Sequence, residues 1–135
     1  MNALDQATTI KEAREIFPIQ YANIDSTFLE VYKEPIENLK AAFSEKGGVY
    51  IVSVGEYDMI CRLPSTEHFK QVRKGSENRD AFEVDRELFS YCLLYPTIDQ
   101  VNVWVSEGKP GIISSAVRTL MDLGLINQKA ETKKL

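Results

Sequence analysis

The stretch that decides the fold is VYIVSVGEYDMICR, residues 49–62. It contains two short β-type runs, residues 49–54 and 57–62, the first of them rich in β-branched side chains. Gly55 and Glu56 separate the runs, and a two-residue loop that begins with glycine is typical of a hairpin with a type II′ turn. The stretch therefore predicts two antiparallel strands joined at these two residues.

Helical patterns precede the hairpin. A capping box that begins at Thr9 predicts a helix over residues 10–17, which a proline then ends. Pro35 suits the first position of a second helix over residues 35–46, whose apolar side chains repeat every three and four residues and which two glycines end. Residues 19–33 fit neither the helical nor the strand period, so we expect mixed strand or loop there.

A run of helices follows the hairpin. Ser65 or Thr66 can cap the first of them, Thr97 and Gln100 form a possible capping box for the third, and Pro110 suits the first turn of the last. Each predicted helix is closed by a glycine or a proline. A polar loop at residues 76–79 is expected after the first of them. The expected bounds of the helices are residues 65–75, 80–95, 97–108 and 110–124.

Length and composition indicate a single α+β domain over residues 1–127, with a polar tail at residues 128–135. The chain has 135 residues, of which 44% are hydrophobic and 27% charged, close to the average for globular proteins. No repeat or linker divides it. The expected architecture is a small antiparallel hairpin or sheet with helices at the N-terminus and a helical cluster at the C-terminus.

No apolar run has the roughly 18 residues that a membrane-spanning helix needs, and the N-terminus lacks the pattern of a secretion signal. We therefore expect a cytoplasmic protein. The apolar neighbours of Cys61 and Cys92 favour buried, unbonded thiols, although the sequence leaves a disulfide between them open. The net charge of −4 is spread along the chain, which does not favour nucleic acid as the partner.

The residues from which catalytic and metal sites are built are scarce. His68 is the single histidine, and no nucleophile or carboxylate motif accompanies it, so we expect an ordinary surface or capping residue. One histidine and two separated cysteines fall short of a zinc site. No phosphate-binding glycine motif occurs. We therefore expect no catalytic residue, metal or cofactor.

One cluster of charge supports a different function. Four basic residues lie within ten positions, and they form either a solvated helix face or the contact site of a small nucleic-acid-binding accessory protein. An enzyme with an unrecognised site is the other alternative. The basic residues are Lys70, Arg73, Lys74 and Arg79.

Three stretches of the second half resemble one family. Arg62-Leu63-Pro64-Ser65 follows the hairpin, CLLYP occupies residues 92–96, and VSEGKPGIISSAVRTLMDLGL occupies residues 105–125. In this order residues 48–125 resemble the tail assembly chaperones of tailed bacteriophages and prophages. The resemblance implies a non-enzymatic protein in the host cytoplasm that holds helices of the tape-measure protein soluble and recruits tail-tube subunits. The resemblance does not identify any binding residue in this chain.

The C-terminal helices are where a partner helix is expected to dock, because such binding uses apolar side chains at helical spacing. Trp104 is the only tryptophan, and it either packs in the core or anchors a partner. Only candidates that the core leaves exposed can serve. The candidate partner-binding residues are Val101, Trp104, Val105, Ile112 and Met121.

Overall fold

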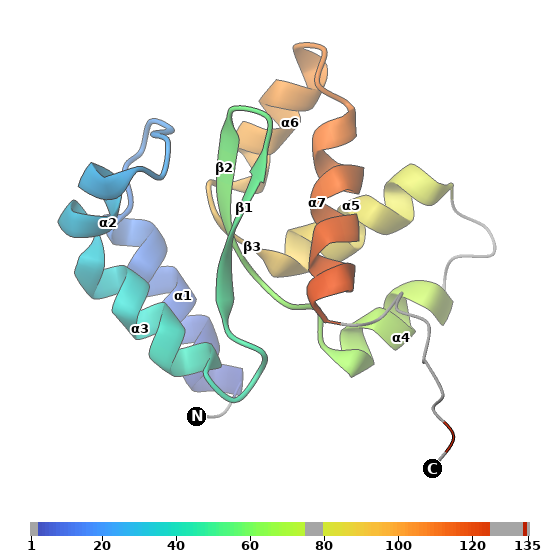
Figure 1. Ribbon diagram of the computed structural model, residues 1–135, viewed down its shortest axis with the longest axis horizontal. Coiled ribbons are helices and arrows are strands. Elements are labelled where there is room, and N and C mark those ends of the chain that lie inside the picture. The colour runs from blue at the N-terminus through green and yellow to red at the C-terminus, as the bar shows by residue number, and fades with distance from the viewer. Residues whose placement is uncertain (1–2, 75–79, 125–133, 135) are drawn as a thin grey trace.

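The computed structural model describes residues 3–74, 80–124 and 134, which form seven helices and a three-stranded antiparallel sheet (Figure 1). This arrangement confirms the predicted α+β class. In chain order the elements are α1 (Ala3–Ile16), α2 (Ser26–Val31), α3 (Lys33–Phe43), β1 (Val49–Val54), β2 (Tyr57–Arg62), α4 (Thr66–Lys74), α5 (Ala81–Cys92), β3 (Leu93–Tyr95), α6 (Ile98–Ser106) and α7 (Gly111–Leu123).

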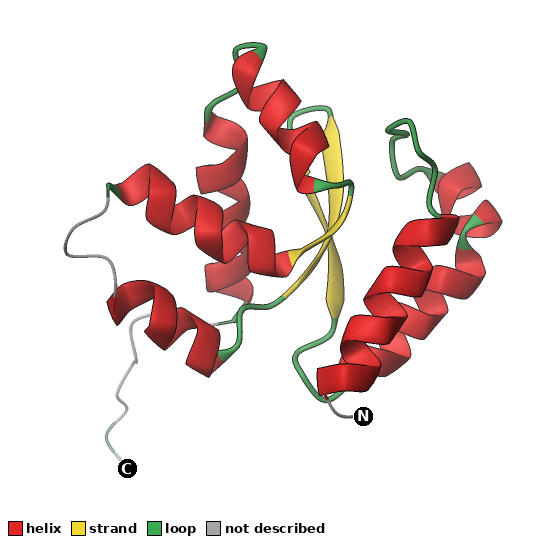
Figure 2. Ribbon diagram, turned by 180° about the vertical axis from the view of Figure 1, so that it is seen from behind, coloured by secondary structure: helices red, strands yellow, loops and turns green. Residues whose placement is uncertain are grey.

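The sheet divides the molecule into two helical layers. Helices α1 to α3 cover one face and α4 to α7 cover the other, as both views of the ribbon show (Figures 1 and 2). The strand order is β1-β2-β3, so β2 is central. Successive side chains of a strand point to opposite faces. Met59 and Cys61 accordingly pack with the α4 to α7 layer and Ile60 with the α1 to α3 layer, all three buried.

The predicted hairpin is confirmed residue for residue. Val54 faces Tyr57 across the turn, and the register continues to Val49 opposite Arg62. Gly55 has a φ of +60°, a left-handed conformation that glycine adopts without the steric cost borne by other residues. The short polar turn therefore sets the register that sorts the side chains of β1 and β2 between the two layers.

The core beneath α4 to α7 contains Trp104, which is only 5% exposed. Its ring meets Tyr21 edge-on at 4.7 Å between centroids and lies 4.5 Å from the ring of Tyr57. Of the two interpretations left open for Trp104, the structure shows packing in the core. Because Tyr21 belongs to the segment between α1 and α2, this contact also ties that segment to the opposite layer.

The core beneath α1 to α3 is aromatic. Phe17, Phe28 and Tyr95 contribute rings whose centroids lie 5.1 to 5.9 Å apart. Leu39 and Phe43 add the buried side of α3. Aromatic rings bury large areas, so a layer of three short helices can be held on a sheet by few residues.

The N-terminal predictions were partly wrong. Helix α1 begins at Ala3, not at residue 10, and Gln6 in the added part donates a hydrogen bond to the carbonyl oxygen of Ala42 in α3 at 3.2 Å. Packing on α3 therefore extends the helix beyond the predicted capping box. Residues 19–33, expected as strand or loop, contain α2, whose N-cap Asp25 accepts from the backbone N–H of Phe28 at 2.9 Å.

The second predicted helix, residues 35–46, is displaced by two to three residues, because α3 begins at Lys33 and ends at Phe43.

After the hairpin the predicted caps are confirmed. Ser65 accepts from the N–H of His68 at 3.0 Å, and Thr97 accepts from that of Gln100 at 3.3 Å. The expected loop at 76–79 and nearly all of the tail at 128–135 lie outside the described residues.

Strand β3 was missed, since the predicted helix over residues 80–95 ends at Cys92 and the chain then becomes extended. Leu93 packs with the α4 to α7 core, whereas Leu94 and Tyr95 pack with the other, and the ladder to β2 shifts register between Ile60 and Cys61. Burial against both layers favours strand over a further turn of helix.

In the part of the chain that the structure describes, every helix is too short or too polar to span a bilayer.

Tyr95 offers a test of how the N-terminal layer is attached. Its hydroxyl accepts from the backbone N–H of Ala22 at 2.8 Å and donates to the carbonyl oxygen of Ala22 at 3.2 Å. Tyr95→Phe leaves both groups without this partner and should lower the free energy of unfolding by about 1–2 kcal/mol, measured by urea denaturation. The control is Tyr32→Phe, because within the described residues the Tyr32 hydroxyl makes no hydrogen bond. An equal loss in both variants would contradict the role of Tyr95.

Candidate functional site

Two places where large apolar side chains remain exposed lie beside a cavity or groove. One is the end of α1 and the segment after it, with Ile16 and Ile19, and the other lies along β1, with Leu29 of α2 and Ile51. Exposed apolar surface of this kind marks sites of contact with other molecules. We call the first the Ile19 surface, defined as Ile16, Ile19, the cavity that Ile19 lines, and Val103 of α6. We call the second the β1 groove, which is lined by Leu29, Ile36, Lys40, Val49, Tyr50, Ile51 and Ile60.

The Ile19 surface is held from both ends. Phe17 is buried in the aromatic core, and two residues after Ile19 the hydroxyl of Tyr21 accepts from the backbone N–H of Asp58 at 2.7 Å and donates to its carbonyl oxygen at 3.1 Å. Tyr21 also stacks on Tyr95 at 6.0 Å. Ile19 therefore stands fully exposed, at 104% of its reference area, on a segment fixed on each side.

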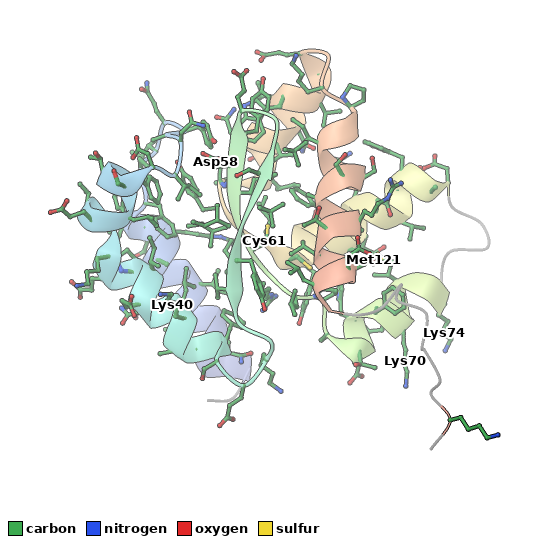
Figure 3. All side chains as sticks on the ribbon, in the orientation of Figure 1. Lys40, Asp58, Cys61, Lys70, Lys74 and Met121 are labelled. Atoms are coloured by element: carbon green, nitrogen blue, oxygen red, sulfur yellow. The ribbon has the colours of Figure 1, made fainter. Side chains whose placement is uncertain are left out.

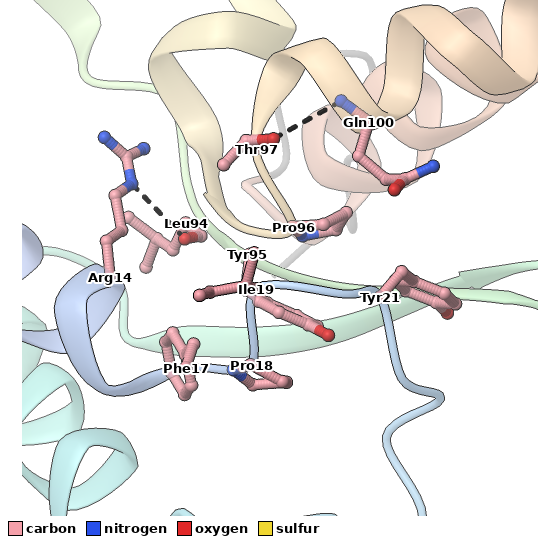
Figure 4. A pocket seen from close by; sticks show the side chains of 10 residues that line it. All are labelled: Arg14, Phe17, Pro18, Ile19, Tyr21, Leu94, Tyr95, Pro96, Thr97 and Gln100. Carbon is pink, nitrogen blue, oxygen red and sulfur yellow. Dashed lines mark hydrogen bonds between the residues drawn. The ribbon is translucent and has the colours of Figure 1, made fainter.

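A small cavity lies beside Ile19 (Figure 4). Its volume is about 40 Å³, space for a few water molecules at most and far below that of a typical ligand pocket. Arg14 lines it, but its guanidinium donates to the carbonyl oxygens of Leu93 at 2.8 Å and Leu94 at 3.5 Å. The cavity is therefore a shallow surface depression, too small for a cofactor or a typical substrate.

The start of α6 extends the Ile19 surface. Gln100 lines the cavity, and Val103, which is 46% exposed, follows one turn later on the same helix. Ile16, at 52% exposure, lies in the last turn of α1. Ile19 thus lines a shallow depression together with tyrosine and glutamine side chains. Ile16 and Val103 lie three residues along the chain from Ile19 and Gln100, two of the residues that line it.

The β1 groove is larger, with a volume of about 360 Å³, and is lined mainly by aliphatic side chains from α2, α3 and the hairpin. Lys40 is the one charged residue among those lining it, and its Nζ lies 3.4 Å from a carboxylate oxygen of Glu37. Polar groups that converge on a small ligand are therefore scarce in it. Like the Ile19 surface, it is shaped for contact with apolar side chains.

The predicted partner-binding residues lie mostly in the core. Val101 and Ile112 are buried, as is Trp104. Val105 and Met121 are partly buried and pack against the same core. In the folded chain the three buried side chains cannot touch a partner, because they are inaccessible. The apolar spacing therefore identified the side chains of α6 and α7 that face the core. It missed Val103, which is exposed on α6 and accessible to a partner.

Ile16 and Ile19 were also missed, although a signal existed. They flank Phe17 and Pro18 in the sequence IFPI, where the predicted helix over residues 10–17 ends and the segment that fits neither period begins. For apolar residues outside a periodic pattern, the sequence does not indicate which side of a helix or strand faces the core. Such residues at the end of a helix are candidates for exposure.

The basic cluster is only partly described. Lys70 and Lys74 are exposed on α4, and Figure 3 shows both extending outward. Glu67 lines the same open surface as the two lysines, which reduces the positive potential there. The side chains of Arg73 and Arg79 lie outside the described part of the chain.

Both cysteines are buried and unbonded, as predicted. Burial raises the pKa of Cys92 to about 12 and that of Cys61 further still. The thiolate is the nucleophilic form of cysteine, so neither residue supplies a nucleophile near neutral pH.

Thiol labelling tests this burial. At pH 8 the native protein should react with an aromatic disulfide reagent at both cysteines at least about 100-fold more slowly than the urea-unfolded chain, because the thiols are inaccessible and protonated. The absorbance of the released thiol measures the rate. Fast labelling of a native sample that retains its circular dichroism would contradict the burial.

His68 is a packing residue. Its ring stacks on Tyr91 at 3.9 Å between centroids, and the guanidinium carbon of Arg62 lies 3.8 Å from the centre of the same tyrosine ring. Among the described atoms its Nε2 is buried without a hydrogen-bond partner. Burial lowers the pKa of His68, and the charge of Arg62 acts in the same direction, while the backbone and carboxylate of Glu87 act against it.

The lowered pKa of His68 predicts a pH dependence of stability. The unfolded chain binds the proton at the ordinary pKa near 6.5 and the folded chain at a lower pKa, so the folded state loses stability as pH falls below about 6.5. In urea unfolding at pH 7.5 and 5.5, the wild type should therefore lose more stability than His68→Gln. Because the chain has one histidine, the difference between the two proteins isolates this residue. An equal or smaller loss in the wild type would contradict the prediction.

Across residues 3–74, 80–124 and 134, three or more histidine, cysteine, aspartate or glutamate side chains nowhere come together as metal ligands. Comparison with known proteins adds no relative: no family model, no curated protein and no solved structure matches this chain.

Proposed function

We propose that the protein is a non-enzymatic binding factor that docks apolar segments of a larger protein on the Ile19 surface. The observation that carries the proposal is Ile19 itself, fully exposed on a segment fixed at Phe17 and Tyr21. A side chain on a segment that is already held in place gives up less conformational freedom on binding than one on a disordered segment does. Burying an isoleucine contributes about 1.5–3 kcal/mol, so Ile19 is suited to be an anchor.

The partner class follows from the resemblance to tail assembly chaperones. In this proposal the bound segments are helices of the tape-measure protein, kept soluble until tail-tube subunits are recruited. An amphipathic helix presents apolar side chains three and four residues apart. Separate apolar points at Ile16, Ile19 and Val103 suit such a pattern better than a single deep pocket does.

The acidic character of the chain supports a protein partner. The net charge of −4 opposes binding to nucleic acid, and Glu67 lies beside the two described lysines of the basic cluster. The buried thiols and the stacking of His68 on Tyr91 support a role without turnover. A nucleic-acid role would instead depend on Lys70 and Lys74.

Co-expression with a tape-measure protein, which the proposal expects to be encoded next to this chain, tests the function. The soluble yield of the large protein should rise when the wild type is present, and the two should co-purify. Ile19→Lys should weaken the complex roughly 10- to 100-fold, the equivalent of losing one buried isoleucine. Calorimetric titration of the purified partners measures the loss.

Two variants serve as controls. Ile51→Lys makes the same substitution at the β1 groove, and Lys70→Glu with Lys74→Glu reverses the charge of α4. Both should bind the partner like the wild type. A tape-measure protein that is equally soluble alone, or full binding by Ile19→Lys, would refute the proposal. Loss of binding only in the α4 variant would place the contact with the partner on α4 and would also refute the proposal.

A further inference from the structure

The two edge strands of the sheet differ in whether another element covers them. At the β3 edge the guanidinium of Arg14 donates to the carbonyl oxygens of Leu93 and Leu94. Helix α1 thus covers that edge. Strand β1 forms the other edge, and in Figure 1 it faces the viewer with no helix in front of it. Natural proteins usually protect an edge strand with a charge, a proline, a bulge or a covering element.

The register identifies the backbone groups that point outward from β1. In a hairpin closed by a two-residue loop, the pair beside the loop is hydrogen-bonded, and bonded pairs alternate from there. Here that pair is Val54 and Tyr57. The outward-facing groups are therefore those of Val49, Ile51 and Ser53. In the described part of the chain no other group forms a hydrogen bond with their backbone.

The side chains of the same residues lie on the face of the sheet that carries the β1 groove. Ile51 is 49% exposed there, beside Val49, and the hydroxyl of Ser53 donates to Asp58 at 2.7 Å. The strand VYIVSV contains no charged residue, in a chain of which 27% is charged. The edge therefore combines unpaired backbone groups with apolar side chains and lacks the usual protection against pairing.

We infer that a second copy of this chain pairs with β1, antiparallel and about a two-fold axis at Ile51, to form a continuous six-stranded sheet. In this register Ile51 faces Ile51 of the second copy, and Val49 faces Ser53. All three are outward-facing residues, so each facing pair exchanges both of its hydrogen bonds. The two Ile51 side chains meet on the groove side and cover each other.

Charge and preorganisation favour a second copy over a foreign peptide. Self-pairing brings no like charges together along the strand, because the strand has none. Lys40, the one charged residue that lines the groove, lies 3.4 Å from Glu37. The strand of a second copy is already ordered in its hairpin. A disordered peptide would have to lose conformational entropy on binding, which weakens its affinity.

Light scattering across about 5–500 µM protein tests the inference. The wild type should show a concentration-dependent dimer. Ile51→Lys should raise the dissociation constant roughly 100-fold, because the two Ile51 side chains no longer bury each other and the two-fold axis sets the two new charges against each other. Ile19→Lys introduces the same charge on the other surface and should leave the dimer unchanged. Thermal unfolding followed by circular dichroism checks that both variants fold.

Amide hydrogen exchange reads the paired edge directly. The outward-facing amides of Ile51 and Ser53 should exchange quickly in dilute wild-type protein and at least about tenfold more slowly in the dimer. The inward-facing amide of Val52 should be protected in both. A wild type that is monomeric over the whole range, a dimer unaffected by Ile51→Lys, or a dimer with unprotected Ile51 would each overturn the inference.

This outcome is independent of the proposed function. Ile51→Lys interrupts the pairing of copies and retains the Ile19 surface, whereas Ile19→Lys does the reverse. Failure of the dimer therefore leaves partner binding to be judged by its own titration.

Discussion

Burial of the sheet on both faces is the constraint on which the rest of the structure depends. Consecutive residues of β2 serve opposite layers, since Met59 and Cys61 pack under α5 and α7 while Ile60 packs against the aromatic rings of the N-terminal layer. A strand covered on one side only would alternate apolar and polar residues. Here the three consecutive side chains are apolar and buried, so the two helical layers are joined through one strand.

Elements that depend on nearby residues were predicted from the sequence, whereas elements that depend on packing with distant residues were not. The hairpin and the caps at Ser65 and Thr97 were predicted because turn and cap residues act within three or four positions of themselves. Strand β3 was not, because three buried residues carry no period and extend a helical pattern without a break. Helix α2 has only six residues and depends on the Asp25 cap and the burial of Phe28, which needs the rest of the layer.

The candidate site was harder to predict than the fold. Apolar spacing along α6 and α7 identifies the side that buries, so the residues chosen from it, such as Trp104 and Ile112, are core residues. Exposure depends on what the neighbouring elements cover. Ile19 is exposed because Phe17 and Tyr21 take the available places in the core, and Ile51 is exposed because no element lies over the outer edge of β1.

Comparison of unfolding in the two layers tests the shared sheet most directly. Trp104, the only tryptophan, reports on the core under α4 to α7, and the backbone amides of Leu39 and Phe43 report on α3 in the other layer. If one sheet holds both cores, the free energy of opening from hydrogen exchange at these amides should equal the free energy of unfolding from Trp104 fluorescence in urea, within about 0.5 kcal/mol. Opening of α3 at a free energy several kcal/mol lower would show that the N-terminal layer unfolds by itself and would contradict the account.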